Sequence, residues 1–223
     1  MADGRGSGLG DALPHPASAW PSTSCAKAGI PDKRAFAAKP ALACQMLERA
    51  FEAGARAAWV TGDGIYCDDH RLRLWLEERE QAYALAVSGK EYVWIGFQQH
   101  KVKELLSALP EETWIRLSAG DGAKGPGRYD WQLLPLNAPL QEGCHRWHLV
   151  RRQLDESTEL TAFVVFAPQS TPLESMVRVA GSRWAIEVSL EAAKGEVGPD
   201  YYEVRSWTGW YRHITLAMWA TPC

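Results

Sequence analysis

The sequence predicts an α/β protein, in which helices cover a β-sheet. Three observations lead to this fold class. Helical and strand patterns alternate between residues 40 and 87, short strand patterns follow one another from 91 to about 167, and a long helical pattern then covers about residues 172–194. An alternation of this kind is typical of a sheet packed against helices rather than of an all-helical or all-β protein.

The composition is that of a globular chain. With 223 residues, of which 46% are hydrophobic, the chain can form one large domain or two small ones. The net charge of −3 does not by itself indicate a nucleic-acid-binding protein, so any contact with DNA would depend on local clusters. Five cysteines without a CxxC pair indicate neither a disulfide framework nor a zinc site. Without a membrane span or a signal-peptide pattern, we expect a cytoplasmic protein with no membrane partner.

The first part of the chain predicts a leader followed by a helix. Residues 1–35 are rich in glycine, proline, alanine and serine, which predicts a disordered or non-native leader. Pro40 then begins a helical pattern that extends to residue 53, and Gly54 ends it.

Residues 36–90 form the first part of the predicted domain. The apolar run 57–60 and the following Thr-Gly-Asp predict a buried strand that places Asp63 at its carboxyl end. Open α/β sheets bind ligands at that end of their strands. A helix through about Arg79 and a strand over 83–87 follow.

Residues 91–170 predict a β-rich insertion, and residues 171–223 predict two helices. The expected strands lie near 92–97, 113–117, 129–136, 146–152 and 160–167, with a short helix over 102–109. Gly195 and Gly198 are expected to end the long helix, and a second helix follows over about 202–219.

Residues 120–125, GDGAKG, have the GxGxxG spacing of dinucleotide-binding loops. Such a loop requires a helix to begin there, whereas Pro126 and a strand pattern follow. We therefore expect a hairpin tip at which Lys124 and Arg128 can contact phosphates. A solvated turn without function and a nucleotide-binding enzyme that uses this loop are the alternatives.

A histidine pair and a cysteine also resemble functional sites, but a structural role explains each of them better. His145 and His148 have the spacing of a metal pair, but on a strand they point to opposite faces of the sheet. Cys67 lies close to Asp63 as a candidate thiol nucleophile, and His70 is the local residue that could activate it.

The strongest candidate site lies in the long helix, in the segment RWAIEVSLEAAK. At about 100° per residue, Arg183, Glu187 and Lys194 fall within about 40° of one another, among apolar positions such as Met176 and Ala180. Charges placed there need a partner. They are either a buried Arg–Glu ion pair or a carboxylate metal ligand with two phosphate-binding cations.

At these residues the sequence resembles the DDE transposases of bacterial insertion sequences, or DDE superfamily endonucleases. Arg183, Glu187 and Lys194 match the last three members of the family's Tyr-Arg-Glu-Lys signature, whereas Ala180 stands at the tyrosine position. The stretch WVTGDGIYCDD resembles the strand that carries the family's second aspartate, here Asp63. Further similar segments are RLSAGDGAKGP, AKGEVG and YEVRSWTGWYRHITLAMWA.

The resemblance implies an RNase H-like (retroviral-integrase-like) sheet with a β-rich insertion before the last catalytic helix. It implies that Asp63 and Glu187 are catalytic and hold metal, with two Mg²⁺ (or Mn²⁺) ions in the complete enzyme, and that Arg183 and Lys194 bind phosphate. The expected partner is double-stranded DNA, at transposon ends and target, in the bacterial nucleoid. A homodimer is a further option.

The family's first aspartate lies within an apolar strand, and the leader offers only Asp3, Asp11 and Asp32 in glycine-, proline- or lysine-rich surroundings. We therefore expect a carboxyl-terminal fragment that lacks the first strands and shows no strand transfer alone. The alternatives are a non-catalytic remnant that binds DNA or inhibits a full-length partner, and a degenerate product that folds poorly because the strand before Asp63 exposes an edge.

Overall fold

We describe the protein from a computed structural model. It covers residues 22–220 except 32, 33, 35, 36, 68, 69, 89, 91, 123, 124, 138–140, 155–159 and 198–204, and leaves undescribed the side chains of 22, 103, 107, 121, 122, 125, 126, 184–190, 192, 193, 196 and 197. The chain forms two compact units, one of residues 37–192 and one of residues 1–36 with 193–223. The domain boundaries expected from the sequence stay predictions.

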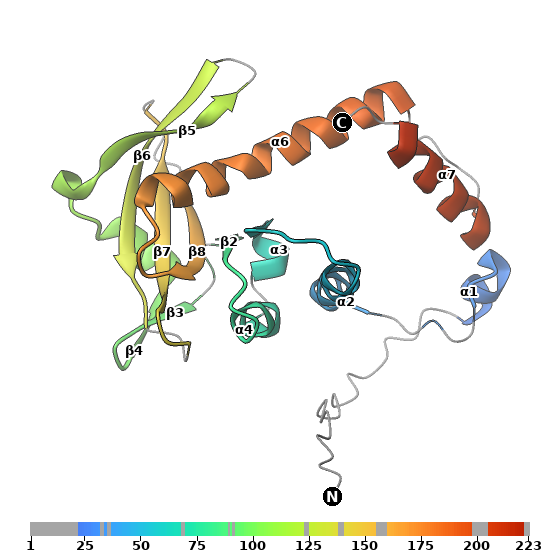
Figure 1. Cartoon of the computed structure of the whole chain (residues 1–223), viewed down its shortest axis with the longest axis horizontal. Coiled ribbons are helices and arrows are strands. Elements are labelled where there is room, and N and C mark those ends of the chain that lie inside the picture. Colours follow the sequence, from blue (N-terminus) through green and yellow to red (C-terminus); the bar gives the residue numbers. More distant parts are fainter. Residues whose placement is uncertain are drawn as a thin grey trace, which may run out of the picture. The chain divides into compact units, whose positions relative to one another are not determined.

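The larger unit is a mixed α/β structure built on a six-stranded sheet (Figure 1). Its strands are β1 (Val60–Gly62), β2 (Tyr83–Val87), β5 (Ile115–Gly122), β6 (Gly125–Pro135), β7 (Cys144–Arg152) and β8 (Leu160–Pro168), in the order β1-β2-β8-β7-β6-β5. β1 is parallel to β2, and the other neighbours are antiparallel. β3 (Tyr92–Ile95) and β4 (Gln98–Lys101) form a separate hairpin. This architecture is compatible with an RNase H-like fold.

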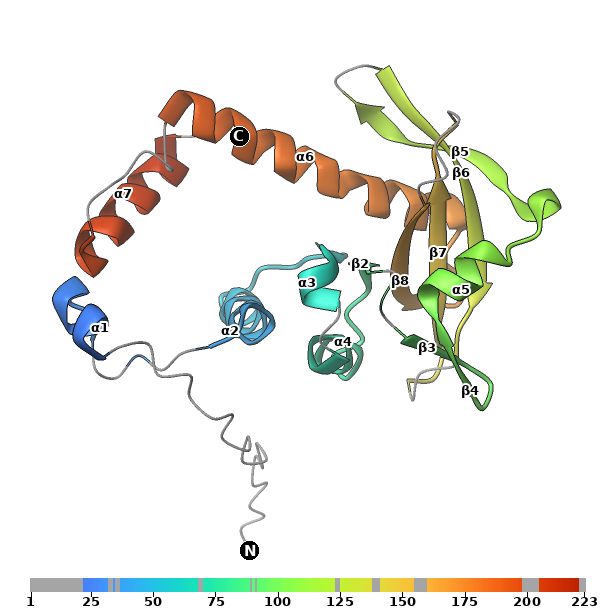
Figure 2. The same ribbon diagram turned by 180° about the vertical axis from the view of Figure 1, so that it is seen from behind.

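Helices and the hairpin cover the two faces of this sheet. The helices are α2 (Lys39–Glu52), α3 (Gly64–Cys67), α4 (His70–Glu77), α5 (Val102–Ser107) and α6 (Leu173–Val197), with a 3₁₀ turn η1 (Glu111–Thr113). Alternate residues of β8 supply two cores, because successive side chains of a strand point to opposite faces. Val164 packs with α3, α4 and α5, whereas Val165 packs with α6. Figure 2 shows α5 over the strands on the first of these faces.

Local sequence signals explain where several elements begin and end. Pro40 stands in the first turn of α2, where its missing N–H costs no hydrogen bond. Gly54 follows α2 with φ +85°, a conformation that glycine adopts without strain. Both the helix and its end are as the sequence predicts. β2 covers residues 83–87 as predicted, and its unbroken apolar run fits a strand with covered faces.

Other boundaries differ from the prediction. β1 is shorter and later than the expected run 57–60. β1 pairs with β2 and is the edge strand of the sheet in the part of the chain that the structure describes. The sequence analysis expected the strand before Asp63 to expose an edge. β4 was not predicted, since its sequence Gln-Gln-His-Lys carries no apolar signal. α6 includes Gly195 rather than ending before it.

The smaller unit contains α1 (Ser22–Ala28) and α7 (Trp207–Ala220). α1 lies inside the expected leader 1–35, where these seven residues form a helix that the sequence analysis did not predict. The predicted start of the last helix, at 202, lies outside the described residues, and the helix is present from Trp207. In the part of the chain that the structure describes, no helix combines the length and apolarity that crossing a membrane requires.

Candidate functional site

Asp63 stands directly after β1, at the carboxyl end of the strand, as the sequence predicts. Its side chain is half-buried and its Oδ1 accepts a hydrogen bond from the Ile65 N–H at 3.0 Å. The Asp63 carbonyl accepts the N–H groups of Tyr66 and Cys67, so the residue caps α3. A carboxylate has about four acceptor positions, so capping leaves capacity for a cation.

The first half of α6 packs on the sheet through the face that the sequence predicts. Met176 and Ala180 are buried, whereas Arg178 and Ser182 are exposed. Arg183 is half-buried and takes part in an interaction within the described chain. It therefore lies at the edge of the buried face and not on the solvated one.

Glu187 and Lys194 belong to the same helix, α6. The side chain of Glu187 lies outside what the structure describes, so its proximity to Asp63 stays a prediction. Lys194 is exposed and belongs to the smaller unit. Of the predicted site residues, all except Lys194 belong to the larger unit.

The GDGAKG segment connects two antiparallel strands. Asp121 pairs with Pro126 and Gly122 with Gly125, so β5 and β6 form a hairpin and no helix begins there. This confirms the predicted hairpin tip and argues against a dinucleotide site. Arg128 is exposed on β6, and Lys124 lies outside the described residues.

The donor chemistry of the candidate carboxylates fits a hard divalent cation. Carboxylate oxygens are the ligands that Mg²⁺ and Mn²⁺ prefer. In the described part of the chain, no group of three or more His, Cys, Asp or Glu side chains is placed to hold a metal. Asp63 is therefore a candidate ligand whose place the structure describes, and the further ligands of such a site would have to come from side chains outside that description.

The other predicted patterns have structural explanations. His148 is fully buried, and burial lowers its pKa from 6.5 to about 4. His145, half-buried on the opposite face of β7, packs against Trp147 with the two rings tilted and their centroids 4.9 Å apart. Cys67 is fully buried, whereas His70 is exposed, so this thiol is not accessible as a nucleophile.

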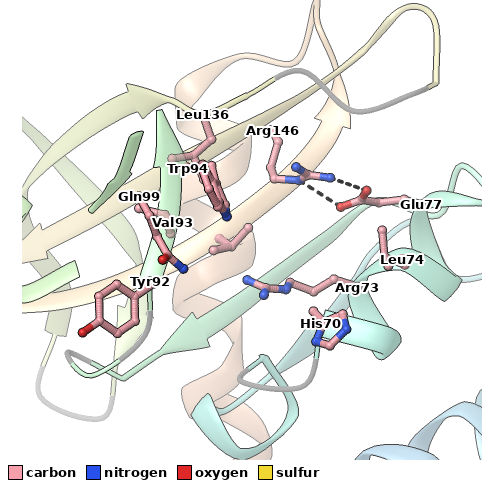
Figure 3. A pocket seen from close by; sticks show the side chains of 11 residues that line it. His70, Arg73, Leu74, Glu77, Tyr92, Val93, Trp94, Gln99, Leu136 and Arg146 are labelled. Atoms are coloured by element: carbon pink, nitrogen blue, oxygen red, sulfur yellow. Dashed lines mark hydrogen bonds and ion pairs between the residues drawn. The ribbon is translucent and has the colours of Figure 1, made fainter. Parts of the chain in front are cut away.

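A buried charge network was not predicted from the sequence. Glu77 on α4 is 3% exposed and accepts a hydrogen bond from Arg146 Nε at 3.0 Å (Figure 3). It accepts another from the Tyr83 hydroxyl at 2.7 Å. Burial and the neighbouring Glu77 carboxylate raise the pKa of Tyr83 well above its usual value. Burial, the largest single effect, lowers the pKa of Arg146, but the hydrogen bond and the charge of Glu77, together with Tyr83, raise it more, so the guanidinium stays charged. This ion pair fixes α4 to β7.

A second network ties the outer strands together. Asp130 accepts a hydrogen bond from Arg116 Nε at 2.9 Å and another from Arg152 at 3.3 Å. The bond from Arg116, the larger effect, and the bond from Arg152 hold the pKa of Asp130 below its ordinary value. Arg152 also binds Glu111. These arginines serve the sheet and not the candidate site.

Comparison with known proteins reaches part of the chain. Residues 11–105 match a family model described as DDE superfamily endonuclease. The match supports the DDE endonuclease superfamily and, at that level, a nuclease type of protein that acts on DNA. It includes Asp63 and the parallel pair β1 and β2, covers less than half of the 223 residues, and ends before α6. No curated protein matches the chain.

Proposed function

We propose that this chain is an insertion-sequence DDE transposase, a protein of metal-dependent DNA cleavage and strand transfer, in which Asp63 and Glu187 share a divalent cation. The observation that carries the proposal is the place of Asp63. It follows an edge strand that is parallel to its neighbour, inside the residues that match the DDE endonuclease family. Carboxyl ends of parallel strands are where such sheets place ligands.

Strand alternation supports the meeting of Asp63 with α6. Val60 packs in the core on the α3–α4 face, and a Cβ on Gly62 would contact Leu85 in that same core. Thr61, which pairs with Ala84 of the α6-side core, is therefore on the α6 side of β1, and Asp63 directly follows Gly62, the last residue of the strand. The spacing in the sequence predicts that Glu187 shares the helical stripe of Ala180 and Arg183.

The residues of the site have distinct tasks. Mg²⁺ or Mn²⁺ ions bound there would activate a water molecule and stabilise the leaving oxygen of a phosphodiester. Asp63 and Glu187 supply the negative charge that holds them, and Arg183 binds phosphate oxygens. Lys194, which belongs to the smaller unit, is a further phosphate-binding cation. Lys124 and Arg128, at the β5–β6 hairpin, would hold phosphates of double-stranded DNA elsewhere along the duplex.

Metal and DNA binding test this proposal. Asp63→Asn keeps a side chain that caps α3 while removing the charge, and Glu191→Gln is a matched control for Glu187→Gln because Glu191 is exposed on the same helix. We expect Asp63→Asn and Glu187→Gln each to weaken Mn²⁺ binding about tenfold or more, and Glu191→Gln to leave it unchanged. The wild-type chain should bind duplex DNA with an affinity that falls as salt rises. Unchanged Mn²⁺ binding in both variants would refute the site.

Strand transfer itself is expected to be undetectable for the chain alone, because two acidic ligands instead of several should leave at least one metal position empty. Nicking that requires Mg²⁺ and that Glu187→Gln abolishes would contradict this expectation.

A second candidate function is a non-catalytic DNA-binding protein. The hydrogen bond that the Asp63 carboxylate accepts from the Ile65 N–H favours this candidate, because it gives the carboxylate a structural role without a metal. DNA binding combined with an absence of specific Mn²⁺ binding would support this candidate.

A further inference from the structure

A pocket of about 520 Å³ lies between α4 and the β3–β4 hairpin. This volume falls within the range of about 300–1,000 Å³ that is usual for ligand sites. The residues that line it are His70, Arg73, Leu74, Glu77, Tyr92, Val93, Trp94, Gln99, Leu136, Arg146 and Val164 (Figure 3).

One wall of the pocket is an aromatic platform. Tyr92 and Trp94 occupy alternate positions of β3 and therefore the same face, about 6.5–7 Å apart along the strand. These two residues are 49% and 52% exposed, so both are accessible to a ligand. Gln99 lies opposite Trp94 in the hairpin register and adds an amide to this wall.

The platform is held in place by the rest of the larger unit. Val93, between the two rings, is 4% exposed and packs in the core. Asn137 donates its N–H to the Trp94 carbonyl at 3.3 Å and its Nδ2 to the Gly96 carbonyl at 2.9 Å. The backbone that carries the two rings is therefore already held in place before a ligand binds, which lowers the entropic cost of binding.

The opposite wall is polar and cationic. Arg73 and His70 project from α4 toward the hairpin (Figure 3). Glu77 and Arg146 neutralise each other in their ion pair, so the charged lining residues carry one net positive charge at neutral pH. A ligand that fits has flat rings at one side and an anionic group at the other.

We propose that this pocket binds unpaired nucleotides of a DNA strand. The bases stack on Tyr92 and Trp94, Gln99 hydrogen-bonds a base edge, and Arg73 with His70 binds the phosphates. The inference rests on the proposed function for its choice of DNA. Topology supports that choice, because β3 follows the carboxyl end of β2 just as Asp63 follows the carboxyl end of the parallel β1.

Binding of a fluorescent 12-nucleotide single strand to the full chain tests the inference. The measurement is made in EDTA and repeated with Asp63→Asn, which separates it from the metal site. We expect Tyr92→Ala and Trp94→Ala each to weaken affinity by about 5- to 150-fold, and Trp94→Phe to keep most of it. Arg73→Gln should lower the slope of log affinity against log salt by about 0.7. Phe97→Ala is the matched control, because Phe97 is fully exposed in the same hairpin and does not line the pocket.

The outcomes separate the alternatives. Equal binding by Tyr92→Ala, Trp94→Ala and wild type overturns the inference even if duplex DNA is bound, and so leaves the proposed function standing. A loss as large in Phe97→Ala, or a change in oligomeric mass instead of DNA affinity, would also overturn it, the latter in favour of a protein-docking surface. If dAMP, added at the same concentration of nucleotides, displaces the single strand, the ligand of the pocket is a free nucleotide and the inference of a DNA strand is overturned. Retention of the Trp94 effect in Asp63→Asn supports the pocket whatever the metal experiment shows.

Discussion

His148 shows how one residue can carry a measurable pH dependence. Its side chain is fully buried on β7, and within the described chain neither ring nitrogen has a hydrogen-bond partner. Burial favours the neutral imidazole and lowers the pKa from 6.5 to about 4. Between these values the unfolded chain binds a proton that the folded chain does not.

The free energy of unfolding should therefore be fully retained above about pH 6.5 and fall as pH drops toward 4, by about 3 kcal/mol from this residue. We expect His148→Leu to remove most of that drop, measured by urea unfolding at pH 7, 6, 5 and 4.5. The control is His145→Leu, on the opposite face of the same strand, which should keep the drop. A pH dependence that is identical in His148→Leu and wild type would show that His148 is hydrated or protonated in the fold.

The buried residue that sequence patterns missed is Glu77. It sits at the end of α4 beside the buried Leu76, and its partner Arg146 is 69 residues away in the sequence. Local periodicity identifies which side of a helix is buried. It does not show which distant cation forms the ion pair that offsets the free-energy cost of burying a carboxylate. Asp63, by contrast, was located from its own surroundings: an apolar strand followed by Gly and Asp.

Among the elements, the contact between α6 and β5 depends on Gly181. A Cβ at this position would lie 2.5 Å from the Ala119 carbonyl oxygen and 2.6 Å from the Ala119 Cβ. The missing side chain is what allows the helix to approach the strand so closely. This contact orients the first half of α6, the helix that carries Arg183 and Glu187.

Gly181→Ala and Gly195→Ala form a matched pair in α6. Gly181→Ala should destabilise the protein by about 1–3 kcal/mol, because backbone and helix must move apart. A methyl group on Gly195 would meet no atom of the described chain within 4 Å, so alanine there should stabilise the helix by about 0.5–1 kcal/mol. Urea midpoints at pH 7 measure both. Equal effects of the two substitutions would show that α6 does not pack closely against β5.

Elements were predictable where the pattern was strong. β2, β8 and α2 lie close to where their apolar runs or caps placed them. β1 and β4 were misplaced or missed, since short strands with few apolar residues owe their structure to pairing with a neighbour rather than to their own sequence. The aromatic pocket was missed for the same reason, because it requires the hairpin to fold back.

Across the whole molecule, the proposed metal site joins residues that are far apart in the chain. The DDE family match covers Asp63 and not α6, and the sequence signature covers Arg183, Glu187 and Lys194. The central claim is that Asp63 and Glu187, both in the larger unit, bind one divalent cation.

Fe²⁺ substituted for Mg²⁺ reacts with added hydrogen peroxide, giving Fe³⁺, hydroxide and a hydroxyl radical that cuts the protein backbone next to the bound ion, which makes cleavage mapping the most direct measurement of this claim. We expect cuts near both residue 63 and residue 187, suppressed by excess Mg²⁺, lost together in Asp63→Asn and in Glu187→Gln, and retained in Glu191→Gln. Cuts near one of the two residues alone, or a pattern that neither Asp63→Asn nor Glu187→Gln changes, would contradict the shared site.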